Sequence, residues 1–285
     1  MNRDPSLRLS DKTPDEWFLM PFSPYAATPD DAPEHPVTEI EGDPSSGVII
    51  LCDHASNEIP PEYRALGMPD DQLSRHIAYD IGAAGMARRL AEAFSAPALL
   101  TNFSRLLIDP NRGEDDPTLV MRLSDGAVVP GNARVDEAEV ERRIKRFYRP
   151  YDRAIKAKIA QAMATGVRPV ILSIHSFTPN WRGYPRPWHA GILWAKDHRL
   201  SQSLIAALAA NDDLVVGDNE PYHGALKGDV IDRHALAHGF SNTLIEIRQD
   251  LIAEAQQAAA WGDRLAETLR PLLEHPQHRE DFRLA

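Results

Sequence analysis

Short apolar runs alternate with amphipathic stretches along most of the chain after residue 47. The run "GVIILCDH" (residues 47–54) is continuously apolar after a turn signal, which is typical of a buried strand. The next stretch, residues 70–94, carries apolar residues at helical spacing and predicts a helix. This change of period from strand to helix is the first sign of an α/β arrangement.

The same alternation continues towards the C-terminus. A long charged stretch predicts one helix, or two helices that meet at Pro150, with Gly166 as a suitable C-cap. Strands that alternate with helices favour a single α/β domain with a mixed, largely parallel central sheet and helices on both faces. The further predicted strands are 97–112 (one or two strands), 168–177, 213–223 and 241–252, and the further predicted helices are 134–166, 195–211 and 253–274.

Residues 1–46 differ from the rest because they are rich in proline and acidic residues. Proline disfavours helix interiors and central strands. We therefore expect an extended arm over residues 1–46 that packs on an α/β domain formed by residues 47–285. A disordered arm is the alternative, and four aromatic residues weigh against it: Trp17, Phe18, Phe22 and Tyr25.

The overall charge narrows the classes of partner. The chain has 285 residues, with 31 Lys and Arg against 42 Asp and Glu, and a formal net charge of −11. An acidic surface repels phosphate backbones and anionic lipid, so we expect neither nucleic acid nor membrane as a partner. Local basic pockets for small ligands are still allowed. The oligomeric state is not readable from the sequence.

The single cysteine, Cys52, excludes a disulfide within the chain and a cysteine-based zinc site. It lies in an apolar run, where a buried free thiol is the ordinary interpretation. The N-terminal residues lack the apolar region of a signal peptide, and no window is long enough to span a bilayer. The expected location is the cytoplasm.

Polar residues stand where four of the predicted strands end, and such residues are expensive to bury without partners. The carboxyl ends of parallel strands meet at one edge of a sheet, where ligands usually bind. One histidine or one Glu–Arg pair there is often only structural, but the combination supplies the parts of a metal-assisted hydrolase. The residues are Asp53, His54, Asp109, Asn111, Arg112, His175, Glu246 and Arg248.

Zinc is the metal that this set of residues favours. A catalytic zinc site needs about three protein ligands and an open position, and imidazole is a preferred ligand. His54 and His175 supply two ligands. The third is open among Asn57, Glu58 and Asp80, since the first two lie near His54 and Asp80 can point back from the following helix.

Other residues suit the remaining tasks of a hydrolase. Glu246 has apolar neighbours, which would raise its pKa towards the range of a general base. Arg105 and Arg112 are candidates for polarising a carbonyl or binding a carboxylate, because a planar guanidinium suits both. Arg248 has two interpretations of equal weight, one in the substrate site and one as a structural partner of Glu246 or Asp250.

Seven motifs in order resemble the N-formylglutamate amidohydrolase family, most closely its branch of predicted amidohydrolases. The resemblance covers roughly residues 46–262. It implies hydrolysis of N-formyl-L-glutamate to glutamate and formate, within amino-acid degradation. The motifs are "CDHASNEIP", "YDIGAAG", "NFSRLLIDPNR", "SIHSFTP", "RPWHAGILW", "VGDNEPYHG" and "IEIRQDLI".

The chain is more distantly similar to zinc carboxypeptidases, through "IDPNR", "SIHSF" and "HGFSNTLIEIRQD". That similarity implies a zinc-carboxypeptidase-like fold with one zinc per chain. It implies His175 as a ligand, Glu246 as the base and Arg105 as the carbonyl-polarising arginine. It further implies Asn111 and Arg112 as carboxylate binders and Tyr222 as a substrate tyrosine. Carboxypeptidases have His-x-x-Glu where this chain has His54-Ala-Ser-Asn57, and a neutral amide is a poor zinc ligand.

The resulting hypothesis is a zinc-dependent hydrolase that cuts the amide bond of an N-acyl amino acid. Asp80 is the preferred third ligand beside His54 and His175, and Asn57 remains a candidate. A first alternative is a carboxypeptidase-like enzyme or an amidase for another N-acyl amino acid. A second is a catalytically silent binding protein on the same fold.

Overall fold

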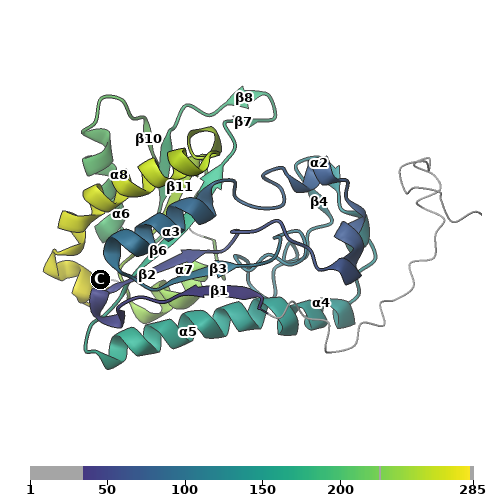
Figure 1. Cartoon of the computed structure of the whole chain (residues 1–285), viewed down its shortest axis with the longest axis horizontal. Helices are drawn as coiled ribbons and strands as arrows, with labels where there is room; N and C mark the ends of the chain where they lie inside the picture. Colours follow the sequence, from purple (N-terminus) through teal and green to yellow (C-terminus); the bar gives the residue numbers. More distant parts are fainter. Residues whose placement is uncertain (1–34, 225, 283–285) are drawn as a thin grey trace, which may run out of the picture. The chain divides into compact units, whose positions relative to one another are not determined.

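The computed structural model describes residues 35–224 and 226–282, and these residues belong to one compact unit. Within the described residues, seven strands form one sheet in the order β1-β3-β2-β6-β11-β9-β10 (Figure 1). The strands of this sheet are β1 (Val37–Ile40), β2 (Val48–Cys52), β3 (Ala98–Thr101), β6 (Val170–Phe177), β9 (Ala190–Leu193), β10 (Val216–Asp218) and β11 (Asn242–Arg248). Two short hairpins are separate from it: β4 (Leu123–Ser124) with β5 (Ala127–Val128), and β7 (Asn180–Trp181) with β8 (Tyr184–Pro185).

The sheet is mixed, as the sequence predicted. Strands β3, β2, β6 and β11 run parallel to one another, and they form its centre. At one edge β1 is antiparallel to β3, and at the other β9 is antiparallel to β11 and parallel to β10. All residues of β2 and β6 are buried, so β2 reads as a continuous apolar run, while β6 has Ser173, His175 and Ser176 among its apolar residues.

Helices cover both faces of the sheet, which confirms the predicted layers (Figure 1). In β2, Ile50 belongs to the apolar core shared with α3, α6 and α8, while Ile49 and Leu51 belong to the core shared with α5 and α7. The helices are α2 (Asp70–Leu73), α3 (Ala83–Phe94), α4 (Glu137–Arg143), α5 (Arg149–Ala164), α6 (Arg199–Ala209), α7 (Val230–His234) and α8 (Ala255–Leu273). Short turns of 3₁₀ helix are η2 (Pro44–Ser46), η3 (Pro61–Gly67), η4 (Pro130–Asn132), η6 (Leu236–His238), η7 (Gln249–Leu251) and η8 (Pro276–Arg279), and η5 (Ile144–Tyr148) is a π-helical turn. None of the described helices combines the length and the apolar character that a membrane span requires.

The single helix predicted for residues 70–94 is wrong in its middle, because α2 ends at Leu73 and α3 begins at Ala83. Gly82 has a φ of +81°, and a Cβ atom there would lie 2.0 Å from the carbonyl oxygen of Ile252. Only glycine fits this close approach and this backbone conformation. The chain turns at Gly82 before α3 starts, so Asp80 lies in the turn region and not on a helix.

Two further stretches test the predicted elements. Residues 97–112 contain one strand, β3, and continue as turns, so Asp109 does not end a strand as predicted. Their apolar side chains instead fill a second core with η3 and η5. Residues 134–166 form the predicted helical run, in which the π turn η5 joins α4 to α5, and Gly166 follows the C-cap Thr165 with a φ of +83°.

The end of the proline-rich stretch belongs to the sheet, since β1 pairs with β3. The amine of Lys158 on α5 lies 2.9 Å from a carboxylate oxygen of Glu41 and 3.2 Å from one of Glu39, which fixes this edge. The four aromatic residues of the expected arm lie outside the described residues. The division of the chain at residue 46 therefore stays a prediction.

Candidate metal centre and active site

Three neighbouring parallel strands bring the candidate site together at their carboxyl ends. His54 follows β2, His175 lies near the end of β6, and Glu246 lies in β11. The register of β6 and β11 pairs Glu246 with His175, so both side chains point to the same face of the sheet. These three polar residues therefore lie together at the carboxyl ends of the parallel strands, as expected from the sequence.

The centre of the site is a buried group of two imidazoles and one carboxylate. Oδ2 of Asp80 lies 2.7 Å from Nδ1 of His175 and 3.3 Å from Nδ1 of His54. One ligand atom from each of the three residues lies within 4.8 Å of the others. The backbone N–H of Asp80 donates to the carbonyl of His54 at 2.9 Å, which holds the turn before α3 against the end of β2.

The far nitrogen of each imidazole faces a different carboxylate. Nε2 of His54 lies 2.8 Å from Oδ1 of Asp109, and Nε2 of His175 lies 3.2 Å from Oδ2 of Asp53 and 3.0 Å from Oγ of Ser173. An ionised carboxylate only accepts hydrogen bonds, so if Nδ1 bound a metal these contacts would keep a proton on each Nε2. Metal-ligating histidines are usually oriented in this way, with the second nitrogen left for the metal.

The carboxylates of the site carry more charge than the nearby guanidinium balances. Burial alone would raise the pKa of Asp80, but the adjacent His54 and His175 outweigh it and lower that pKa. Burial also opposes ionisation of Asp109, yet Arg105 and His54 hold its pKa well below the usual value. When both imidazoles are neutral, as metal ligands must be, the buried negative charge exceeds the one guanidinium and suits a divalent cation. The donor set therefore fits a metal ion between His54, Asp80 and His175.

Glu246 is a buried carboxylate whose Oε2 has no hydrogen-bond partner among the described residues. Burial, reinforced by the charge of Asp80, raises its pKa to about 7, although His175 opposes the shift. A carboxylate whose pKa is about 7 can take up and return a proton at physiological pH.

Arg105 lies beside the metal-ligand group. Its Nη2 is 2.7 Å from Oδ2 of Asp109, and its Nη1 is 3.6 Å from Oδ1 of Asp80. Burial favours the neutral form, but Asp109 and Asp80 outweigh it and raise the pKa of Arg105. The site therefore contains a fixed cation next to its candidate ligands.

The remaining candidates for the third ligand lie outside the group. The side-chain amide of Asn57 donates to the carbonyl of Leu73 at 2.9 Å, and Glu58 is exposed while its backbone carbonyl accepts from Ser104. Asn57 is therefore turned towards the C-terminal end of α2, and among the described residues only Asp80 completes a set with the two histidines.

Asn111 and Arg112 flank Asp109. The backbone N–H of Asn111 donates to Oδ1 of Asp109 at 2.9 Å, and its side-chain oxygen accepts from the N–H of Val230 at 3.0 Å. Nη1 of Arg112 donates to the carbonyl of Asn111 at 2.9 Å, and its Nε donates to Oγ1 of Thr118 at 3.3 Å. The two predicted carboxylate binders are thus beside the site, with part of their hydrogen-bonding capacity already used.

Tyr222 and Arg248 both contact a further arginine, Arg186. The hydroxyl of Tyr222 accepts from Nη1 of Arg186 at 3.0 Å. Nε of Arg248 donates to Oδ1 of Asp250 at 2.8 Å, and its Nη1 faces the carbonyls of Arg186 at 3.3 Å and Trp188 at 3.4 Å. Arg248 makes the predicted pair with Asp250 and supports the backbone at Arg186.

Sequence reasoning gave no role to four residues that the structure places in or around the site. Asp53 and Asp109 stood out as strand-end residues, but nothing along the chain showed that they face the histidines. Ser173 lies two positions before His175 on the same strand, so the strand period carried a usable signal. The hydroxyl of Tyr151 donates to Oδ1 of Asp53 at 2.6 Å, from a helix distant in sequence, and no pattern indicated it.

Asp229, next to Val230, gives a stability test independent of the candidate ligands. It is buried at the N-terminus of α7, where its carboxylate accepts from the N–H of Asp232 at 2.7 Å. Burial raises its pKa to about 7 in the folded chain, so ionisation opposes folding increasingly as the pH rises from about 4 to 7. Asn caps a helix equally well. We expect Asp229→Asn to stabilise the protein by roughly 1–3 kcal/mol at pH 8.

The measurement is the free energy of unfolding of wild type and Asp229→Asn from pH 4 to pH 8. The gain should shrink towards zero at pH 4, since Asp229 is then protonated in the folded chain and largely so in the unfolded chain. A gain that is constant across this range, or absent at pH 8, contradicts the assignment.

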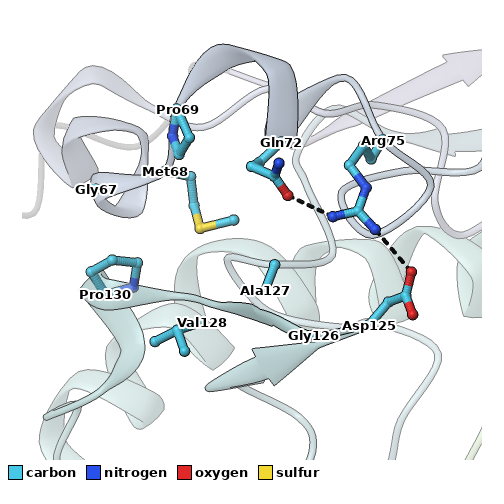
Figure 2. Close-up of a pocket in the computed structure, with 10 residues that line it drawn as sticks. All are labelled: Gly67, Met68, Pro69, Gln72, Arg75, Asp125, Gly126, Ala127, Val128 and Pro130. Atoms are coloured by element: carbon cyan, nitrogen blue, oxygen red, sulfur yellow. Dashed lines mark hydrogen bonds and ion pairs between the residues drawn. The ribbon is translucent and has the colours of Figure 1, made fainter. Parts of the chain in front are cut away.

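A separate hollow of about 470 Å³ lies between the η3–α2 segment and the β4–β5 hairpin. Figure 2 shows Met68 and Val128 on its apolar side and the ion pair of Arg75 with Asp125, at 2.8 Å, on its polar side. None of the candidate ligands lines it. The hollow is therefore distinct from the site at the sheet edge.

These observations define an α/β protein with a buried His–Asp–His group and a neighbouring buried carboxylate, Glu246, at the carboxyl ends of its central strands. The family model of N-formylglutamate amidohydrolase matches residues 46–253, which is most of the chain. The chain belongs to this family and is a hydrolase that acts on amide bonds. The resemblance expected from the sequence is thereby confirmed. No curated protein matches the chain.

The solved structures that are similar to the chain include two bacterial proteins. A gene product of Agrobacterium tumefaciens, Atu2144, is 37% identical, with a TM-score of 0.78 over 83% of this chain and 94% of that chain. An N-formylglutamate amidohydrolase from Ralstonia eutropha JMP134 is 22% identical, with a TM-score of 0.55 over 83% of this chain and 97% of that chain. The second likeness shows a shared fold.

Proposed function

We propose that this chain is a zinc-dependent amidohydrolase of N-acyl amino acids, with N-formyl-L-glutamate as the first substrate to test. The observation that carries the proposal is the convergence of Nδ1 of both histidines on Oδ2 of Asp80, beside the buried carboxylate of Glu246. Membership of the amidohydrolase family supports the type of bond that is cut.

His54, Asp80 and His175 would hold one zinc ion per chain. Imidazole nitrogen and carboxylate oxygen are ligands that zinc prefers, and three protein ligands leave a position for substrate chemistry. When bound, zinc would supply a Lewis acid for the hydrolysis of the amide. Asp109 and Asp53 orient the two histidines through their Nε2 atoms, so the imidazoles need little rearrangement.

Glu246 is the general base in this proposal. It accepts a proton from the water that attacks the acyl carbon, and it returns the proton to the nitrogen as the C–N bond breaks. The products are a carboxylic acid and the free amino acid, so N-formyl-L-glutamate gives formate and glutamate. The raised pKa of Glu246, about 7, suits both halves of this transfer near neutral pH.

Four further residues would bind or polarise the substrate. Arg105 stabilises the negative charge that develops on the acyl oxygen, an effect that reaches about 10²–10³ in rate for comparable donors. Asn111 and Arg112 bind the substrate carboxylate from the side of Asp109. Tyr222 covers the acyl group from the loop before α7, and Arg248 acts by fixing the neighbouring backbone.

The test is elemental analysis of purified wild type and His175→Ala, combined with measurement of formate release from N-formyl-L-glutamate. We expect about one zinc per wild-type chain, little in the variant, and formate only from the wild type. Arg182→Gln, at the exposed tip of the β7–β8 hairpin, serves as a control that should keep both properties.

Other outcomes of the same assay favour the alternatives. Release of amino acid from other N-acyl or peptide substrates, but not from the formyl compound, favours another amidase or a carboxypeptidase-like enzyme. Zinc-loaded protein that binds N-acyl amino acids without cutting any of them favours a silent binding protein. Absence of metal from the wild type after zinc is supplied overturns the metal centre.

A further inference from the structure

Arg186 stands at the same sheet edge as the candidate metal centre. It follows the β7–β8 hairpin, and its Nη1 donates to the carbonyl of Thr178 at 3.3 Å. Its guanidinium carbon lies 5.8 Å from the ring centroid of Phe177, which is two residues after His175 on β6. A strand rises about 3.3 Å per residue, and residues two apart lie on the same face. The guanidinium therefore lies close to His175, towards the carboxyl end of β6.

Aromatic rings hold the guanidinium in one place. Its carbon lies 4.8 Å from the ring centroid of Tyr222 and 5.2 Å from that of Trp181. Arg186 is only 8% exposed. Stacking on aromatic faces suits arginine and fixes the direction of its planar donors.

No carboxylate neutralises Arg186 among the described residues, in contrast to Arg105 and Arg248, which pair with Asp109 and Asp250. The acceptors that it has, the hydroxyl of Tyr222 and the carbonyl of Thr178, are neutral. A cation this deeply placed is unfavourable without an anion. The site therefore has a fixed positive charge with capacity for an anionic ligand.

Tyr222 links Arg186 to the two carboxylates of the site, Glu246 and Asp80. Tyr222, which Arg186 contacts directly, is close enough to Glu246 and Asp80 for both carboxylates to raise its pKa, in addition to the larger effect of burial. An anion bound by Arg186 would thus lie beside Tyr222 and Phe177, at the end of β6 that carries His175.

We propose that Arg186 binds an anionic group of the substrate and makes the enzyme select N-acyl amino acids with an acidic side chain. This inference rests on the proposed function. Asn111 and Arg112 take the α-carboxylate, and Arg186 takes the side-chain carboxylate through its fork of N–H donors. Arg248 is a positioning residue for Arg186, since it holds the carbonyl of Arg186.

The test compares N-formylglutamate with N-formylglutamine, which has the same shape and lacks the side-chain charge. Wild type should favour the glutamate compound in kcat/KM by about 10–100-fold, the size expected for one charge-assisted pair. Arg186→Gln should bring this ratio close to one. Arg186→Lys should keep part of it, because the charge remains and the fork is lost.

Arg182→Gln is the matched control. Arg182 lies on the same hairpin and its guanidinium carbon is 5.6 Å from the centroid of the same Trp181 ring, but its side chain is exposed. It should leave the ratio at the wild-type value. The melting temperature of each variant shows whether the fold is kept.

Each other result decides between the roles of Arg186. A ratio in Arg186→Gln that stays at the wild-type value, with or without a lower melting temperature, makes Arg186 a structural contact between hairpin and loop and overturns the proposal. Absence of a wild-type preference overturns it too. If the wild type cuts neither compound, the proposed function fails. Calorimetric binding of the two compounds then tests separately whether Arg186 forms an anion site. Selective loss of N-formylglutamate binding in Arg186→Gln supports the anion site, while unchanged affinity, or no binding by the wild type, overturns it.

Discussion

The Glu246→Gln variant will lose at least two orders of magnitude in kcat while its zinc content stays at the wild-type level. The physical reason is that Gln has nearly the same shape but cannot accept and return a proton. Glu246 is not one of the residues whose ligand atoms converge, so the metal should remain. The measurement is formate release under saturating substrate, with elemental analysis of the same samples.

The pH dependence adds an independent readout for Glu246. Because the base works in its ionised form and its pKa is raised to about 7, kcat/KM of wild type should rise with pH through this value. Burying this charge also opposes folding above pH 7, so Glu246→Gln should melt at a higher temperature than wild type at pH 8. Loss of zinc from the variant, or activity above a tenth of wild type, would show that another group is the base.

Asp53→Asn should weaken zinc binding by about 10–100-fold, the usual effect of losing a carboxylate that orients a metal-ligating histidine. Asp53 lies 3.2 Å from Nε2 of His175, and a neutral amide would no longer fix the proton on that atom. Competition with a chromophoric chelator measures the change in the dissociation constant of zinc.

Tyr151→Phe is the graded control for this experiment. It removes the hydrogen bond of 2.6 Å to the other oxygen of Asp53 and leaves the carboxylate beside His175 in place. We expect a smaller loss of zinc affinity than in Asp53→Asn. Equal affinity in Asp53→Asn and wild type would mean that His175 is oriented without Asp53, or does not bind the metal.

The histidines were predictable because each stands at the carboxyl end of a buried strand. Period and apolar character identify such strands, and parallel strands place their ends at one edge. The same reasoning identified Glu246 as a candidate, because its sequence neighbours Ile245 and Ile247 indicate a buried strand. The fold class followed from the alternation of strands and helices alone.

Residues outside regular strands were harder to place. Asp80 was assigned to a helix because helical spacing continues through residues 74–82, whereas in the structure these residues form turns and α3 begins only after Gly82. Asp109 reaches His54 from a turn that looked like a strand end. Arg186 gave no signal, because its role depends on aromatic residues from three separate segments.

The order of strands in the sheet has a consequence for the biosynthesis of the enzyme. Strand β11 is the last strand in the chain, yet it lies between β6 and β9. A growing polypeptide cannot join the two parts of the sheet until residues 242–248 have been synthesised and inserted. Such late, long-range pairing slows folding and leaves strand edges open in the meantime. Because β11 also carries Glu246, the proposed general base, amidase activity should appear in a growing chain only after this final insertion.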